Sequence, residues 1–363
     1  MLVHICCAVD SHYFLQRLKE DFPDEELIGF FYDPNIHPYS EYYLRLLEVK
    51  RSCKELGIKL IEGEYDFRAW LNAVKGLEKE PEKGKRCSVC FDHRFKESAK
   101  VASKLKQKSF TSTLLTSPKK SISQLKTQGQ LAAKEFGVEF VTVDYRTKNG
   151  TLEQNKMAKE SKIYRQDYCG CIYALGMQRS EQKKIADELF DPISNQILPD
   201  SIQERIKLYQ KRVELEEKKI KYEILKERFL NYRLKSGLLK VKKRVVFSHI
   251  LPYSTLKRGF TRGNIEKKID DVYYLNRDEI RFITLKTYNK LAKKEYKNIL
   301  DLIYSPPSFK EEIKIRSKIS PNPYDLSAIL VVEEIFEKKI EVVIDALVYE
   351  DVKERLIILE KEE

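Results

Sequence analysis

The first half of the chain alternates short apolar segments with longer amphipathic ones. The short segments are rich in aliphatic and aromatic side chains, and we predict strands over residues 2–6, 27–32, 59–64, 110–115 and 139–144. Between them, apolar side chains recur at helical spacing at Tyr42, Leu46, Val49 and Cys53. Cys53 is therefore expected on the buried face of a helix over residues 41–56, because a free cysteine behaves as a small apolar residue. Since strands that alternate with helices are typical of a parallel sheet, we predict an α/β domain over residues 1–180.

The pattern changes near residue 190, where a long amphipathic segment begins. Ser201 and Glu204 have the spacing of a capping box, and Ser236-Gly237 resembles a helix stop. The apolar residues between them follow helical spacing at Ile202, Ile206, Tyr209, Val213, Ile220 and Ile224. We therefore predict a helical connector over residues 181–238, with a helix that would extend about 51 Å at 1.5 Å per residue.

The last part of the chain offers fewer signals. It combines an apolar, β-branched segment at 242–250, a basic and turn-rich segment at 255–264, and alternating apolar runs over 329–359. It contains no cysteine. We predict a smaller α+β region over residues 239–363, with no assigned role.

Composition narrows the class of protein. The chain has 363 residues, of which 42% are hydrophobic and 34% charged, so a disordered or fibrous protein is excluded. No run approaches the ~18 to 20 apolar residues that span a bilayer, and no signal peptide is recognised, so we expect a cytoplasmic protein with no membrane partner. Disulfides are rare in the cytosol, and the seven cysteines therefore need another explanation.

The charge suits a polyanionic partner. Lys and Arg exceed Asp and Glu by 30 to 24 in residues 1–180 and by 38 to 32 in the remainder, which gives +6 for each part. Residues 100–134 contain eight lysines and no acidic residue, and the chain has 21 tyrosines. Cations interleaved with aromatic rings are typical of nucleic-acid binding. A solvated lysine-rich helix face explains the same pattern, and that alternative stays open.

Six of the seven cysteines form three close pairs, which are Cys6-Cys7, Cys87 with Cys90, and Cys169 with Cys171. Each pair follows a different part of the α/β unit, so the pairs can converge only where strand ends form a crevice. Six ligands exceed the four of a structural zinc site or of one [4Fe–4S] cluster. We therefore expect a cluster and a second metal, with a catalytic disulfide relay as the alternative.

Asp10 follows the first cysteine pair by three residues. Its carboxylate could supply an oxygen ligand to a metal that the cysteines also approach. The alternative is that Asp10 is the N-cap of the next helix.

Several motifs together resemble the epoxyqueuosine reductase QueH family. They occur in order over residues 1 to about 176, and no resemblance is recognised after about residue 190. The motifs are HICCAVDS from His4, FYDPNIHP from Phe31, Glu41 with Arg45, RCSVCF from Arg86 with Arg94, TSTLL from Thr111, and YRQDYCGC from Tyr164. Many relatives carry a further cysteine where this chain has Asp10.

The resemblance implies a HUP-type, Rossmann-like domain that holds a [4Fe–4S] cluster beside a mononuclear iron. It also implies reduction of the epoxide of epoxyqueuosine to queuosine at the wobble position of tRNA, without cobalamin. The cofactor ligands would be Cys6, Cys7, Cys87, Cys90, Cys169 and Cys171, with Asp10 as a further metal ligand. Which ligands hold the cluster and which the single iron stays open. The electrons would come from a donor such as ferredoxin or flavodoxin.

Other residues have expected roles near this crevice. Epoxide deoxygenation consumes two protons, and we predict Asp33, His37 and Tyr168 as acids, because they flank the expected crevice and have usable pKa values. Turn formation by Asp33 and helix entry by His37 are the alternatives. Contacts with RNA are predicted for Lys83, Lys85, Arg86, Lys119, Lys120 and Arg165.

Two other functions fit the same residues. An iron–sulfur tRNA thiolation enzyme on a HUP fold would need ATP, yet the chain has neither a GxGxxG after a strand nor a Walker A sequence. A noncatalytic RNA-binding protein with structural zinc would bind tRNA without changing it. The hypothesis that accounts for the whole cysteine set is the reductase.

Overall fold

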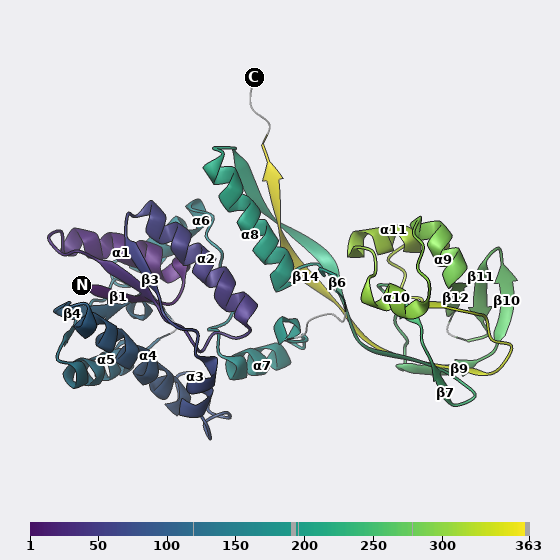
Figure 1. The fold of residues 1–363 in the computed structure, drawn as a ribbon, viewed down its shortest axis with the longest axis horizontal. Helices are drawn as coiled ribbons and strands as arrows, with labels where there is room; N and C mark the ends of the chain where they lie inside the picture. Colours follow the sequence, from purple (N-terminus) through teal and green to yellow (C-terminus); the bar gives the residue numbers. More distant parts are fainter. Residues whose placement is uncertain (119, 190–193, 195, 278, 360–363) are drawn as a thin grey trace. The chain divides into compact units, whose positions relative to one another are not determined.

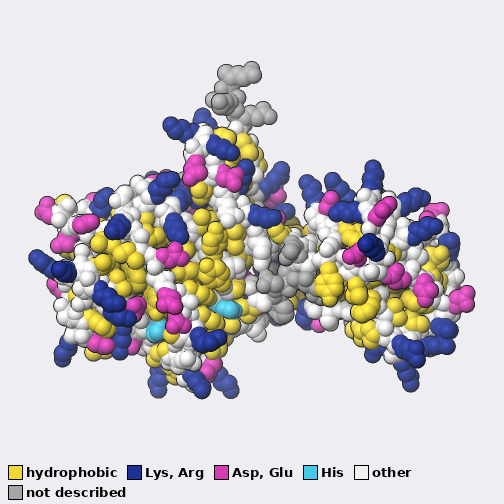
Figure 2. All heavy atoms as spheres, in the orientation of Figure 1, with side chains coloured by type: hydrophobic (Ala, Val, Ile, Leu, Met, Phe, Trp, Pro, Cys, Tyr) yellow, Lys and Arg dark blue, Asp and Glu magenta, His cyan; other side chains and the backbone are white. Residues whose placement is uncertain are grey.

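The structure is a computed structural model of the chain, and it describes residues 1–118, 120–189, 194, 196–277 and 279–359. The chain divides into two compact units. The first unit combines residues 1–186, 205–224 and 357–363, and the second combines residues 187–204 and 225–356. The expected contiguous domains, 1–180, 181–238 and 239–363, therefore differ from these units, because two later segments return to the first unit. In each unit, Lys and Arg are spread over the face seen in Figure 2.

The first unit is built on a five-stranded parallel sheet with the order β3-β2-β1-β4-β5. The strands are β1 (Leu2–Ile5), β2 (Ile28–Phe31), β3 (Lys59–Glu62), β4 (Ser109–Ser112) and β5 (Glu139–Phe140). All five predicted strands are present, and each ends before its predicted last residue. The difference is largest after β4, where Thr113–Thr116 turn into the 3₁₀ helix η1. There the side chain of Ser112 accepts a hydrogen bond from the backbone of Leu114.

Helices cover both faces of this sheet, so the predicted α/β class with a parallel sheet is confirmed (Figure 1). One face carries α1 (Ala8–Asp21), α2 (Tyr39–Glu55) and α6 (Gly150–Glu160), and the other carries α4 (Lys85–Lys104) and α5 (Ile122–Phe136). Two shorter helices, α3 (Phe67–Ala73) and α7 (Ile172–Glu181), complete this part. Cys53 lies on α2 and is buried in the main core, as its helical spacing predicted.

The strand order reverses between β1 and β4, which makes this point the topological switch of the sheet. The chain turns toward β2 after β1 and toward β5 after β4, so the carboxyl ends of these two strands leave a crevice. Cys6 and Cys7 follow β1 directly, and η1 follows β4. The fold therefore places the first cysteine pair where ligands of such sheets are found.

The predicted long helix is wrong in its length. Helix α8 (Ile202–Glu217) begins as expected, with the backbone N–H of Glu204 donating to Ser201 Oγ at 3.3 Å. It ends at Glu217, Lys219 adopts a left-handed conformation with φ of 55°, and strand β6 (Tyr222–Val241) follows. The apolar spacing between residues 220 and 236 fits a strand as well as a helix. Pairing with β14 (Ile340–Ile358), more than 100 residues later, decides for the strand.

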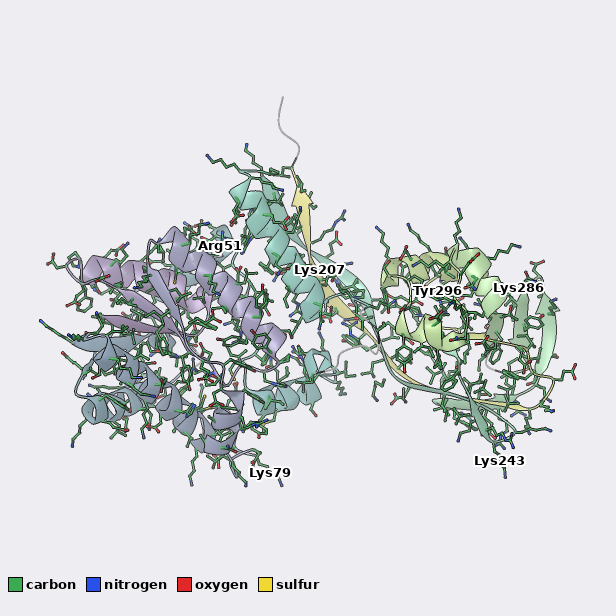
Figure 3. The ribbon with its side chains drawn as sticks, in the orientation of Figure 1. Arg51, Lys79, Lys207, Lys243, Lys286 and Tyr296 are labelled. Atoms are coloured by element: carbon green, nitrogen blue, oxygen red, sulfur yellow. The ribbon has the colours of Figure 1, made fainter. Side chains whose placement is uncertain are left out.

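Helix α8 packs on α2 within the first unit. Arg212 forms a buried ion pair with Glu48, and Arg51 donates two hydrogen bonds to Glu216 at 2.8 and 2.9 Å. Arg51 is labelled in Figure 3. Residues far apart in sequence thus complete the first unit, which is why a contiguous connector was the wrong description.

In the residues that the structure describes, the second unit contains two sheets and a group of helices packed beside them. One sheet has the order β10-β11-β12-β13-β8 and is antiparallel except for the parallel pair β12 and β13. Its strands are β8 (His249–Ile250), β10 (Ile265–Ile269), β11 (Val272–Leu275), β12 (Arg281–Thr284) and β13 (Ile329–Val332). The other sheet has the order β7-β6-β14-β9, with β7 (Arg244–Val246) and β9 (Phe260–Gly263) at its edges.

Strand β13 lies in the core of this unit. Its side chains point alternately to the two faces of the sheet and pack in two separate hydrophobic clusters. Leu330 and Val332 pack in the cluster that contains Val342 of β14, whereas Ile329 and Val331 pack in the cluster of the helices. Those helices are α9 (Leu285–Ala292), α10 (Ile299–Tyr304) and α11 (Phe309–Ile319). Among the described residues, no helix in either unit is long and apolar enough to cross a membrane.

Candidate metal centre and active site

A cavity of about 560 Å³ lies in the first unit and collects five of the six paired cysteines. They are Cys6, Cys87, Cys90, Cys169 and Cys171. Each pair lies at the beginning of a helix: Cys7 is the N-cap of α1, Cys87 is in the first turn of α4, and Cys171 is the N-cap of α7. Helix N-termini favour negative charge, so this arrangement suits thiolates or an anionic group.

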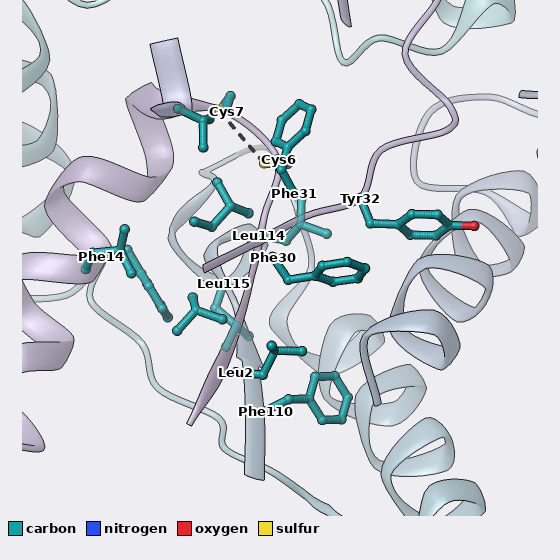
Figure 4. Packing of buried hydrophobic residues seen from close by; sticks show 14 of the residues in the cluster. Leu2, Cys6, Cys7, Phe14, Phe30, Phe31, Tyr32, Phe110, Leu114 and Leu115 are labelled. Carbon is teal, nitrogen blue, oxygen red and sulfur yellow. Dashed lines mark hydrogen bonds between the residues drawn. The ribbon is translucent and has the colours of Figure 1, made fainter. Parts of the chain in front are cut away.

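The first group consists of Cys6, Cys7 and Asp10, all of which are buried. Their potential ligand atoms lie within 4.8 Å of one another. Cys6 Sγ is 3.8 Å from Cys7 Sγ, a contact drawn in Figure 4, and 3.9 Å from Asp10 Oδ2. Asp10 is the third residue of α1 and not its N-cap, so the capping alternative is wrong. The three side chains are placed as a metal site would need them.

Burial raises the pKa of Asp10 to about 6. The amide of Gln154 opposes this effect by donating to Asp10 Oδ1 at 2.7 Å. The same bond leaves Oδ2 on the side of Cys6. The pKa of the Cys7 thiol is raised by its hydrogen bond with Cys6 and by burial. Burial therefore favours the protonated forms of both groups, and a cation bound between them would offset this effect and release their protons to solvent.

The second group consists of Cys87, Cys90, Cys169 and Cys171. A hydrogen bond from Cys171 is the main cause that lowers the pKa of Cys169 to about 6, and the charge of Lys120 adds to it against the effect of burial. Burial raises the pKa of Cys87 and Cys90, while the charge on Cys169 raises both further. These four sulfurs therefore interact with one another, although they come from segments about 80 residues apart.

The loop that carries Cys169 and Cys171 is anchored on α2. Arg45 donates to the carbonyl oxygens of Tyr168 at 2.9 Å and Cys169 at 3.3 Å, and it pairs with the buried Glu41 at 2.7 Å. Gly170 adopts a φ of 101°, and a Cβ there would lie 2.7 Å from Ile36 Cγ1. The left-handed backbone and the close approach both require glycine at this position.

The three predicted acids have different positions. Tyr168 lines the cavity, and its hydroxyl donates to the carbonyl oxygen of His37 at 2.7 Å. His37 is not among the described residues that line the cavity, and its ring stacks on Phe67 with centroids 4.5 Å apart. The backbone N–H of His37 donates to Gly170 at 2.9 Å. His37 therefore contacts the cysteine loop through its backbone.

Asp33 is also not among the described residues lining the cavity. It is 1% exposed and forms a buried ion pair with Arg94, which does line the cavity. Burial raises the pKa of Asp33 to about 6, and the charge of Arg94 limits the rise. Asp33 therefore holds the Arg94 side chain in position at the cavity.

The predicted RNA contacts are only partly at the surface. Arg86 is 2% exposed, and its guanidinium donates to three backbone carbonyl oxygens, those of Leu77, Glu78 and Glu80. Arg86 also lines the cavity, so its contact with RNA stays a prediction. Lys83 and Lys85 are exposed at the start of α4, and Lys120 and Arg165 line the cavity. Lys119 lies outside the described residues.

Sequence reasoning missed Gln154, Asn35 and Gln166, which also line the cavity. Each holds a buried side-chain oxygen without a hydrogen-bond partner in the part of the chain that the structure describes. Buried polar atoms are rarely left unpaired, so these oxygens indicate a site for a polar ligand. Asn35 and Gln166 lie within the motifs FYDPNIHP and YRQDYCGC, which could have pointed to them, whereas Gln154 lies in no motif.

Comparison with known proteins identifies the family. A model of the family described as epoxyqueuosine reductase QueH matches residues 1–177. The protein named epoxyqueuosine reductase QueH from Helicobacter pylori is 39% identical over 372 residues, which cover 97% of this chain and 98% of that protein. The protein of the same name from Haemophilus influenzae is 37% identical over 176 residues, covering 48% of this chain and 71% of that protein.

A solved structure, the U34-tRNA thiolase NcsA from Methanococcus maripaludis with its [4Fe-4S] cluster, is also similar. It has 15% sequence identity and a TM-score of 0.32, and the match covers 59% of this chain and 73% of that chain. At that score the likeness says nothing about the site. The cysteine motifs, the family match and the relative that is similar over nearly its whole length agree, and this chain belongs to the epoxyqueuosine reductase QueH family.

Proposed function

We propose that this chain reduces the epoxide of epoxyqueuosine at the wobble position of tRNA to give queuosine. The observation that carries the proposal is the convergence of three cysteine pairs and Asp10 on one edge of the sheet. It occurs in a chain that is similar to a named epoxyqueuosine reductase along 97% of its length. In the reaction, the epoxide takes up two electrons and two protons, the carbon–oxygen bonds break, and an alkene and water form.

The residues fit the two iron groups that we propose. Cys6, Cys7 and Asp10 would hold a single iron, because three ligands leave a coordination position open and their atoms lie within 4.8 Å of one another. Cys87, Cys90, Cys169 and Cys171 would hold a [4Fe–4S] cluster, because four thiolates are the usual ligands of such a cluster. When bound, the iron groups would supply the electrons and the Lewis acidity that removal of the epoxide oxygen requires, and no cobalamin would be involved.

The protein side chains would control protons and water. Tyr168 and Lys120 both line the cavity and can carry a proton to the departing oxygen. Burial lowers the pKa of Lys120, but the charges of Cys169 and Cys87 outweigh burial and raise it. Lys120 is therefore cationic at neutral pH. Asp33 and His37 would act through their contacts with Arg94 and the cysteine loop.

The tRNA would approach with its wobble base extruded. An anticodon loop is single-stranded, so its bases can turn outward into a cavity. Lys83 and Lys85 would contact phosphates, and Arg165 and Lys120 would face the nucleotide at the cavity. Because tRNA and reduced thiols are cytoplasmic, we place the reaction there. Electrons would come from a small carrier such as ferredoxin or flavodoxin.

The test is to incubate anaerobically reduced protein with tRNA that contains epoxyqueuosine, without cobalamin or ATP. Mass spectrometry of the nucleosides should show the loss of one oxygen atom. The matched control is Cys53→Ala, which removes a core cysteine outside the site and should retain the reaction. A colourless protein that binds zinc and leaves the epoxide intact would contradict the proposal, as would a reaction that depends on ATP.

A further inference from the structure

We propose that one end of the sheet β7-β6-β14-β9, in the second unit, binds the phosphodiester backbone of tRNA. This inference rests on the proposed function and adds a second contact with the same substrate. The family match ends at residue 177, and the proposed site involves only residues after 240. We define the basic tip as Lys242, Lys243, Arg244, Lys338 and Lys339.

The basic tip follows from strand pairing. Val241 pairs with Arg244, so Lys242 and Lys243 form the two-residue turn between β6 and β7. Lys338 and Lys339 immediately precede β14, the strand on the other side of β6. The interaction with the Lys338 side chain is the main reason why the pKa of Lys242 is lowered. The two side chains therefore lie close together, although 96 positions separate them in the sequence.

The basic tip is exposed and has little compensating charge. All five of its residues are exposed, and none of them forms an ion pair or side-chain hydrogen bond with an acidic residue among those the structure describes. Glu337 is the acidic residue next to it in the chain. Residues 233–268, which surround the turn in the sequence, contain eleven Lys and Arg and only one acidic residue, Glu266. Lys235 and Arg262 of this stretch pair with Asp345 and Glu341 of β14, whereas the residues of the basic tip have no such partner among the described residues. Like charges brought together in this way repel one another unless an anion lies between them.

Figure 2 shows Lys and Arg side chains gathered over the free end of the β6–β7 hairpin. Figure 3 shows Lys243 at that end, well away from Lys286 on helix α9 of the same unit. Phe247, which directly follows β7 in the sequence, is 60% exposed. Cations beside an exposed aromatic ring are typical of nucleic-acid binding, and the phosphate backbone is the polyanion that the proposed substrate presents.

The turn allows a test that does not weaken the fold. Lys242 and Lys243 have φ angles of 49° and 66°, the left-handed conformation of a type I′ turn, in which Asn-Gly is preferred. The double substitution Lys242→Asn and Lys243→Gly thus removes two charges and suits the backbone better. The matched control is Lys286→Gln with Lys290→Gln, which removes the same charge from exposed positions on α9 of the same unit.

The experiment measures the affinity of the full-length protein for tRNA against salt concentration. We expect the turn variant to bind tRNA about tenfold more weakly at 0.1 M salt, and the control to bind like the wild type. The slope of the logarithm of the binding constant against the logarithm of salt concentration should be smaller in magnitude by about 1.5 to 2 in the turn variant. The KM for tRNA should rise by a similar factor while kcat stays constant. Lys338→Gln with Lys339→Gln should weaken binding similarly and leaves the turn unchanged.

Equal affinities for the turn variant and the control would overturn the proposal. Binding of anionic phosphatidylglycerol vesicles through the basic tip, with unchanged affinity for tRNA, would also overturn it in favour of a lipid surface. Failure of the proposed function is distinguishable, because the wild type would then leave epoxyqueuosine unchanged while the binding measurement still reports on the basic tip.

Discussion

The two groups of candidate ligands reach the same edge of the sheet by different routes. Cys6, Cys7 and Asp10 lie within five residues, at the end of β1 and the beginning of α1, so local geometry alone brings them together. The four other cysteines come from α4 and from the loop before α7, and they meet only because Arg45, His37 and Gly170 fix that loop. The first group should therefore tolerate damage to the loop that the second group does not.

Removing a ligand of the second group should have the largest effect. Cys169→Ala should lower the iron content from about five per chain to about one, because a [4Fe–4S] cluster with three thiolates is held poorly. Reduction of epoxyqueuosine should be abolished. Iron analysis, visible absorbance and nucleoside mass spectrometry measure the change. A variant that kept all of its iron would show that Cys169 is not a ligand.

Gly170→Ala should separate the two groups without removing any ligand. The new Cβ would meet Ile36 at 2.7 Å in a backbone with φ of 101°, so the loop must shift at a cost of about 1–3 kcal/mol. We expect loss of the cluster absorbance while the single iron stays bound. Gly176→Ala is the matched control, because a Cβ at that position would have no heavy atom of another segment within 4 Å and α7 should become slightly more stable. If both variants retained the cluster, the anchored loop would not be essential.

Gln154→Leu should affect the first group alone. It removes the hydrogen bond to Asp10 Oδ1 while keeping the size of the side chain. Removing a residue that hydrogen-bonds to a metal ligand typically lowers metal affinity by about 10- to 100-fold, so the single iron should bind more weakly by about that factor. Competition with a chelator measures the affinity. Gln178→Leu, which also alters a cavity-lining amide, should leave iron affinity unchanged. Equal losses in both variants would argue against a specific role for Gln154.

The smallest effect concerns how the free energy of unfolding depends on pH through the buried carboxyl of Asp33. Burial raises the pKa of Asp33 from 3.8 to about 6 in the folded state, so the folded protein binds the Asp33 proton more tightly than the unfolded chain does. The contribution of Asp33 to the free energy of unfolding is therefore complete below about pH 4 and is lost as pH rises through 6. Denaturant unfolding at several pH values should show this fall in the wild type and a smaller fall in Asp33→Asn. A difference between the two proteins that stays constant with pH would contradict the assignment.

The fold of the first unit was largely predictable, whereas the α8–β6 region was not. The segments that form strands β1 to β5 are short and largely apolar, which favours strands. Cys53 lies on the buried face of the helix that the apolar spacing predicted. The helix prediction is wrong after Glu217, because the apolar spacing of the residues that follow fits a strand as well as a helix. Only β14, which pairs with β6 from the far end of the chain, resolved that ambiguity.

The sequence by itself determined that this protein carries three cysteine pairs and Asp10 on a parallel α/β unit, because short-range spacing and strand patterns are properties of neighbouring residues. Only the tertiary structure decided which side chains share a cavity. It buried Arg86, paired Asp33 with Arg94, and brought Gln154 to Asp10 from 144 positions away. It also gathered Lys338 beside Lys242. These contacts depend on packing between distant segments, which no local pattern records.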